Sequence, residues 1–149
     1  MLAGDITNSG AIPALEMAVR FAARRQAVIA GNVANLTTPD YRPLDLSVDE
    51  FRRVLGEAVE RRRAEGVGGG GGAGPLVWSE TAELKRGARG ELVVQATTAG
   101  RGILAHDRNN RDLERLMQAQ AENAIAFRVA TELLRGRFEQ LRVAIGERP

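Results

Sequence analysis

The residues of this sequence that could perform chemistry are few and stand apart from one another. His106 is the single histidine and precedes Asp107, but no Ser or Cys nucleophile motif accompanies this pair. The absence of cysteine excludes disulfides, thiolate zinc sites and cysteine nucleophiles. The carboxylates have neither paired nor metal-ligand spacing. We therefore expect no catalysis, no cofactor and no small-molecule substrate.

Two further segments could bind phosphate groups. The glycine-rich run 66–75 lacks the Gly-Lys-Ser/Thr ending of a P-loop, so its composition favours a flexible linker. The run Arg61–Arg63 is the densest basic stretch, but Glu60 and Glu65 bracket it and the net charge is only +2. A nucleic-acid surface needs basic residues concentrated on one face. We interpret the run as a solvated helix end and expect no nucleic-acid partner.

The composition predicts helices and a modest core. The chain has 149 residues, of which 44% are hydrophobic, 27% charged and only 4% aromatic. Much of the apolar content is alanine, which favours helix but buries little area per residue. We therefore expect part of the burial to come from partners.

The N-terminal part has the pattern of an amphipathic helix that begins near Pro13 and that Pro39 ends. Its apolar residues recur at steps of four and three, with Gln26 in the one polar slot, which is a heptad pattern. This stripe consists of Leu15, Val19, Ala22, Ile29, Val33 and Leu36. A second, weaker apolar line beside it consists of Met17, Phe21 and Val28.

The middle of the chain predicts shorter elements. Ser47 and Glu50 have capping-box spacing, and Phe51, Leu55 and Ala58 follow on one face of a short helix that ends near Glu65. Beyond the linker, the runs 76–78 and 92–94 could be short strands. Gly87 and Gly90 would mark a turn between them.

The last third predicts a coiled-coil helix. Asn109 or Asn110 can cap it, and Gly146 and Pro149 mark its end. Its seam follows steps of four and three over more than four heptads. The seam consists of Leu113, Met117, Gln120, Ala124, Phe127, Thr131, Leu134, Phe138, Leu141 and Ile145.

The predicted fold is mainly α, with long N- and C-terminal helices paired as an antiparallel coiled coil around a short, irregular or small-β middle segment. Five regions follow along the chain. They are a flexible N-terminus (1–12), the N-terminal helix with its turn and short helix (13–65), the linker (66–75), the middle segment (76–106) and the C-terminal helix (107–149). A second apolar line on the C-terminal helix consists of Ile125, Val129, Leu133, Gly136 and Val143. Helices with two apolar faces suit contacts with neighbouring subunits.

The run 31–42 resembles the N-terminal signature of bacterial flagellar axial proteins, N-x-A-N-x-x-T-P-G-Y-K/R. The matching residues are Asn32, Ala34, Asn35, Thr38, Pro39, Tyr41 and Arg42. The run 107–114, with Asn109 and Asn110, is similar to the D-G-N-N-x-D-L-E segment of that family. The tail 133–145 resembles the end of proximal-rod subunits. Asp40 and Arg108 stand where the family has glycines, and Asp tolerates a positive φ better than Arg does.

The resemblance implies a structural subunit of the flagellar basal-body rod, whose terminal helices pair and polymerise into a drive shaft that transmits torque. Its implied partners are copies of itself, other rod proteins, membrane-ring or rod-adaptor proteins at the rod base, and the flagellar type III export apparatus. The implied location is the basal body, spanning the periplasm.

Other interpretations of the sequence remain open. The chain could be another flagellar axial protein of the rod or hook, or a non-flagellar coiled-coil adaptor that binds one partner helix. The first ten residues are polar, and no run approaches the ~18 apolar residues of a membrane span. We therefore expect a cytoplasmic protein or one exported without a cleaved signal peptide.

Overall fold

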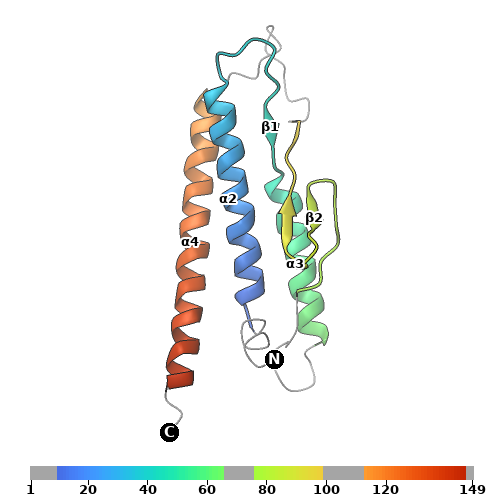
Figure 1. Cartoon of the computed structure of the whole chain (residues 1–149), viewed down its shortest axis with the longest axis vertical. Coiled ribbons are helices and arrows are strands. Elements are labelled where there is room, and N and C mark those ends of the chain that lie inside the picture. The colour runs from blue at the N-terminus through green and yellow to red at the C-terminus, as the bar shows by residue number, and fades with distance from the viewer. Residues whose placement is uncertain (1–9, 66–75, 99–112, 147–149) are drawn as a thin grey trace.

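The computed structural model describes residues 10–65, 76–98 and 113–146, and its described part is mainly helical with small two-stranded sheets (Figure 1). The expected glycine linker, the cap at Asn109 or Asn110, and His106 lie outside the described residues, as does most of the expected flexible N-terminus.

Helix α2 spans Ile12–Ala34, close to the expected range. Pro13 lies in its first turn, where a missing N–H has no helical partner to lose. The helix ends at Ala34, before Pro39, with Asn35 as its C-cap residue. Pro39 is thus not the residue that ends the helix, because Asn35 already caps it four residues earlier.

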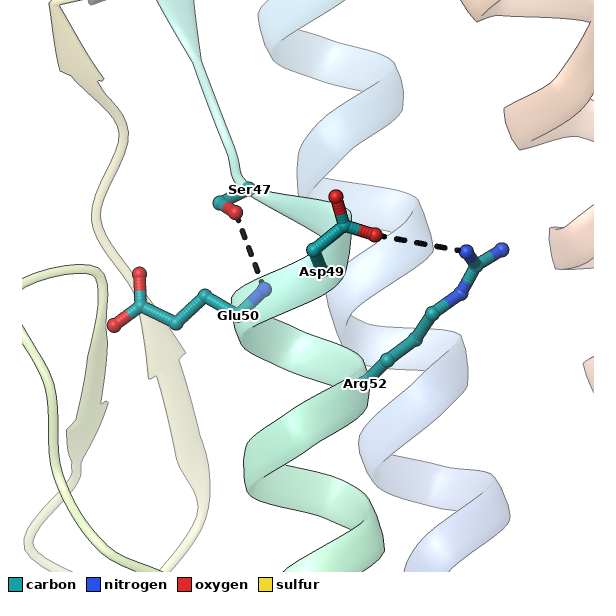
Figure 2. Close-up of polar contacts among 4 residues, drawn as sticks. All are labelled: Ser47, Asp49, Glu50 and Arg52. Carbon is teal, nitrogen blue, oxygen red and sulfur yellow. Dashed lines mark hydrogen bonds and ion pairs between the residues drawn. The ribbon is translucent and has the colours of Figure 1, made fainter.

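Helix α3 spans Val48–Glu65, and the expected N-terminal cap is half formed. The backbone N–H of Glu50 donates to Ser47 Oγ at 3.1 Å, and Figure 2 shows the Glu50 carboxylate pointing away from Ser47. Glu83 Oε2 accepts from the Ser47 N–H instead, at 2.8 Å. The Asp49–Arg52 ion pair in the same view is 3.8 Å long and exposed, so it contributes little stability.

The middle segment forms short antiparallel strand pairs. Strand β2 (Leu84–Arg86) pairs with β3 (Leu92–Val94), and β1 (Leu44–Asp45) pairs with β4 (Thr97–Thr98). The expected strand at 92–94 and the turn between Gly87 and Gly90 are present, with Gly90 donating to the Gly87 carbonyl at 2.9 Å. Residues 76–78 are not a strand. Leu76 and Trp78 enter the core from an irregular segment, whereas Val77 between them is exposed. The strand that pairs with β3 is Leu84–Arg86 instead.

A small hydrophobic core lies between α2, α3 and the middle segment. The rings of Phe21 and Phe51 stack with centroids 4.0 Å apart and an interplanar angle of 6°. Trp78 is buried, and the Arg86 guanidinium lies 5.3 Å from the centre of its ring. The described cluster consists of Met17, Phe21, Val28, Leu46, Phe51, Val54, Ala58, Leu76, Trp78, Leu84, Leu92 and Val94.

Helix α4 spans Leu113–Gly146 and lies beside α2 on the side away from α3 (Figure 1). The two helices run in opposite directions in that view, so the N-terminal end of α4 lies near the C-terminal end of α2. No residue of α4 belongs to the described core cluster. The C-terminal helix therefore depends on α2 for its packing within the described part of the chain.

This division of the packing predicts that a Phe→Ala substitution lowers the free energy of unfolding more on the core side of α2 than on the side of α4. Phe51→Ala should lower the free energy of unfolding by about 3–5 kcal/mol, because it empties the stacked core. Phe127→Ala, at a ring of α4 that is 39% exposed, should cost only about 1–2 kcal/mol. Denaturant unfolding measures both, and equal losses would contradict the separation of α4 from the core.

Candidate assembly surface

The turn that follows α2 is held by the side chain of Asn35. Its Nδ2 donates to the Gly31 carbonyl at 2.9 Å, which satisfies a carbonyl at the helix end. Its Oδ1 accepts from the Thr38 hydroxyl at 3.3 Å, and its carbonyl accepts from the Thr38 N–H at 3.0 Å. Asn35 and Thr38 therefore shape one local turn.

Asn32 joins the end of α2 to the strand that follows the turn. Its side chain is 6% exposed, and its Nδ2 donates to the Leu44 carbonyl at 2.7 Å. Its Oδ1 accepts from the Leu44 N–H at 3.0 Å and from the Tyr41 hydroxyl at 3.0 Å. The amide thus pairs both backbone groups of Leu44, as a neighbouring strand would.

The remaining signature residues of this run lie at the surface. Ala34, Pro39 and Arg42 are exposed. Asp40 has a φ of 55°, a left-handed conformation that Asp adopts more readily than most residues other than glycine. The run 31–42 is therefore the last turn of α2 and the turn that follows it, in which Asn32 and Asn35 bond within the chain and Ala34, Pro39 and Arg42 face solvent. Asn109 and Asn110 lie outside the described residues.

The N-terminal stripe faces α4. Asn123 of α4 is 3% exposed and donates to the Ala22 carbonyl at 3.0 Å and to Gln26 Oε1 at 2.9 Å. Leu15, Val19, Ile29 and Val33 share the face of α2 that carries Ala22 and Gln26, and all four are buried or half-buried. The second line of α2 (Met17, Phe21 and Val28) lies in the core.

The expected C-terminal seam lies partly beside α2 and partly in solvent. Leu134 and Leu141 are half-buried. Leu113 is 47% exposed, Met117 54% and Ile145 61%, while Phe127 and Phe138 are each 39% exposed. The buried residues of α4 are Asn123 and Ala130, each one position before a seam residue. At these two positions the face against α2 is therefore displaced from the expected seam by one residue, which is about 100° around the helix. The seam positions Leu134 and Leu141 remain part of that face.

The displaced seam residues border an apolar groove between the two helices. Ala23 and Gln26 of α2 line it on one side, and Ala124, Phe127 and Thr131 of α4 line it on the other. Arg128 and Glu132 also line it and give it charges of both signs.

A second exposed apolar surface runs along the opposite side of α4. Ile125 is 66% exposed, Val129 52%, Leu133 55% and Val143 57%. A Cβ added to Gly136 on this side would meet nothing within 4 Å, so Gly136 borders open space within the described part of the chain. We name this set of five residues the outer face of α4. It matches the second apolar line expected from the sequence.

Two polar residues with structural roles are not evident from the sequence. Asn123 lies one residue before the expected seam, so the heptad pattern does not single it out. Glu83 is 9% exposed and accepts from the Ser47 N–H and the Thr97 hydroxyl, each at 2.8 Å. A single carboxylate between short apolar runs has no pattern that would reveal these contacts.

The described residues contain neither a metal-ligand cluster nor a membrane-spanning helix. Within residues 10–65, 76–98 and 113–146, no group of three or more His, Cys, Asp or Glu side chains could hold a metal ion. In the same part of the chain, no helix has the length and apolar character needed to cross a membrane. What stands out instead is the exposed apolar area of α4.

A comparison with known protein families found no match, and a comparison with curated protein sequences found no significant similarity. The case for a function therefore rests on the residues and their placement.

Removal of the Asn32 amide should release the strand at Leu44. Asn32→Leu is expected to cost about 1–3 kcal/mol and to speed exchange of the Leu44 amide hydrogen, because both backbone groups of Leu44 lose their partner. Tyr41→Phe is the control, since it removes only one hydroxyl bond and should leave that exchange nearly unchanged. Exchange of the Leu44 amide at the parent rate in Asn32→Leu would contradict this role.

The positive φ of Asp40 predicts opposite tolerance for two substitutions. Asp40→Val should lower the free energy of unfolding by about 1–2 kcal/mol, because a β-branched residue is strained in this conformation. Asp40→Gly should be nearly neutral, since relief of strain offsets the greater entropy of the unfolded chain. Thermal or denaturant unfolding distinguishes the two. A valine variant as stable as the parent would show that residue 40 adopts another conformation in solution.

Proposed function

We propose that this chain is a structural subunit of the flagellar basal-body rod, most similar to the proximal-rod subunit FlgB. In this proposal α2 and α4 pair as an antiparallel coiled coil and polymerise through their outward faces into a drive shaft that transmits torque. The chain acts without catalysis, cofactor, nucleic acid or small-molecule substrate.

The observation that carries the proposal is the exposed apolar area of α4. This helix has 34 residues, of which only Asn123 and Ala130 are buried in the single chain. Burial of one half-exposed Val, Leu, Ile or Phe side chain contributes roughly 1 kcal/mol. Apolar surface on this scale is unusual for an isolated soluble chain and favours coverage by neighbouring subunits. The exposed residues concerned are Leu113, Met117, Ile125, Phe127, Val129, Leu133, Phe138, Val143 and Ile145.

The run 31–42 at the end of α2, which we call the signature turn, supports the same function. Its resemblance to flagellar axial proteins extends over the run 31–42, and the exposed residues Ala34, Pro39 and Arg42 are free to contact a neighbouring subunit. The proposed partners are copies of this chain, other rod proteins, membrane-ring or rod-adaptor proteins, and the flagellar export apparatus. The proposed location is the basal body across the periplasm, reached without a cleaved signal peptide.

The alternative functions use the same surface differently. A non-flagellar adaptor would cover the apolar face of α4 with one partner helix and would form a discrete soluble complex. Another rod or hook protein would polymerise as proposed here but at a different position along the axial structure. Assembly behaviour therefore separates these functions.

The test introduces a charge into the outer face of α4. Val129→Glu should leave the free energy of unfolding of the single chain within about 0.5 kcal/mol of the parent, since Val129 is 52% exposed. It should prevent incorporation of the chain into basal bodies, because the charge would be buried between subunits. Quantification of the tagged chain in purified basal bodies, together with cell motility, measures this effect.

The matched control adds the same charge at a polar position of α4. Gln140 is exposed and accepts from Arg137 at 2.9 Å, so Gln140→Glu keeps a favourable neighbour and should still assemble. Absence of the parent chain from basal bodies would overturn the rod function. A discrete soluble oligomer that Val129→Glu dissociates would favour the adaptor.

A further inference from the structure

One buried polar contact joins α4 to α2. The Nδ2 group of Asn123 donates to the Ala22 carbonyl at 3.0 Å and to Gln26 Oε1 at 2.9 Å. Asn123 is 3% exposed, so water does not substitute for these partners. A buried amide that loses its hydrogen bonds carries a large desolvation cost, so this contact constrains where α4 can lie.

The apolar part of the interface supplies much weaker positional information. On α2 it consists of Leu15, Val19, Ile29 and Val33, which repeat with heptad spacing along one face. On α4 the residues with reduced exposure include Leu116, Ala130, Leu134 and Leu141, again with a repeat close to seven residues. A shift of one helix by a heptad therefore places similar apolar side chains opposite one another.

The half-buried hydroxyl of Thr131 on α4 does not remove this ambiguity. It donates to the Phe127 carbonyl of its own helix at 2.7 Å. This bond moves with α4 and is the same in every register.

We infer that Asn123, through its contact with Gln26 and the Ala22 carbonyl, fixes the register of α4 on α2. A shift of one heptad toward either end places Asn123 beside Leu15 and Val19 or beside Ile29 and Val33. Neither pair offers a side-chain acceptor, so the amide would be buried without that partner. Asn123 is thus a positioning residue that selects one register among several of similar apolar packing.

The register has a direct effect on the surface that the chain presents. A shift of one heptad moves the outer face of α4 by about 10 Å relative to the signature turn at the end of α2. A partner that binds both the outer face of α4 and the turn at the end of α2 could then contact only one of them at a time. The inference itself concerns a single chain and does not depend on the proposed function.

Disulfide cross-linking of the full chain measures the register, because the native sequence has no cysteine. Ala23 and Ala124 line the same groove, so Ala23→Cys with Ala124→Cys reports the register of the structure. Ala30→Cys or Glu16→Cys, each with Ala124→Cys, reports a shift of one heptad in either direction. Positions 16, 23, 30 and 124 are exposed, so an oxidant reaches all of them.

With Asn123 present, the native pair should cross-link and the shifted pairs should not. Asn123→Leu should raise the yield of shifted cross-links roughly tenfold and lower the native yield. Asn123→Ala, which has high helix propensity, should give the same redistribution in case the larger side chain prevents folding. Thr131→Val, which removes a half-buried hydroxyl bonded within α4, is the matched control and should preserve the parent pattern.

Two results would overturn the inference. Exclusive cross-linking of the native pair in both Asn123 variants would show that apolar packing alone selects the register. Failure of the native pair to cross-link in the chain that retains Asn123 would show that α4 does not lie on α2 in this register. Both measurements use the isolated chain, so they remain informative even if the chain is absent from basal bodies.

Discussion

Helix α2 carries two apolar lines that face different neighbours, and the positions of the other elements depend on this division. Phe21 and Val28 face the core with α3 and the middle segment, whereas Ala22 and Ile29 lie on the face that meets α4. The two lines are about a third of a turn apart, as the spacing of Phe21 and Ala22 requires. Helix α2 can therefore pack against α3 and the middle segment on one side and against α4 on the other, and α4 need not contact the core.

The long helices were predictable because many residues repeat the same pattern, and the errors have local physical causes. Proline is a visible stop signal, so the sequence points to Pro39, whereas α2 ends at Ala34 and the Asn35 side chain bonds to the Gly31 carbonyl. The partner of β3 was missed because strands of two or three residues are selected by contacts distant in sequence. Residues 76–78 look like a strand in isolation, yet Trp78 is buried from an irregular segment.

The C-terminal helix shows why a heptad pattern does not by itself identify a contact face. Its apolar residues form more than one line, and the face against α2 shares Leu134 and Leu141 with the expected seam. The sequence favours the line with more large apolar residues, but the face against α2 contains Asn123 and Ala130 instead. Small and polar residues bring the two helices together, while Leu113, Met117 and Ile145 are left with substantial exposure. The large residues on α4 are thus available to contacts outside the single chain.

Two buried asparagines give the structure positions that apolar packing cannot specify. Asn32 pairs both backbone groups of Leu44, and Asn123 bonds to the Gln26 side chain as well as to the Ala22 carbonyl, so each attaches a separate segment to one site on α2. Apolar contacts tolerate sliding because neighbouring turns of these helices carry similar side chains. An amide does not tolerate it, because its donor must meet an acceptor at a fixed distance and angle. Apolar side chains therefore hold these elements together, and the two amides determine how they are aligned.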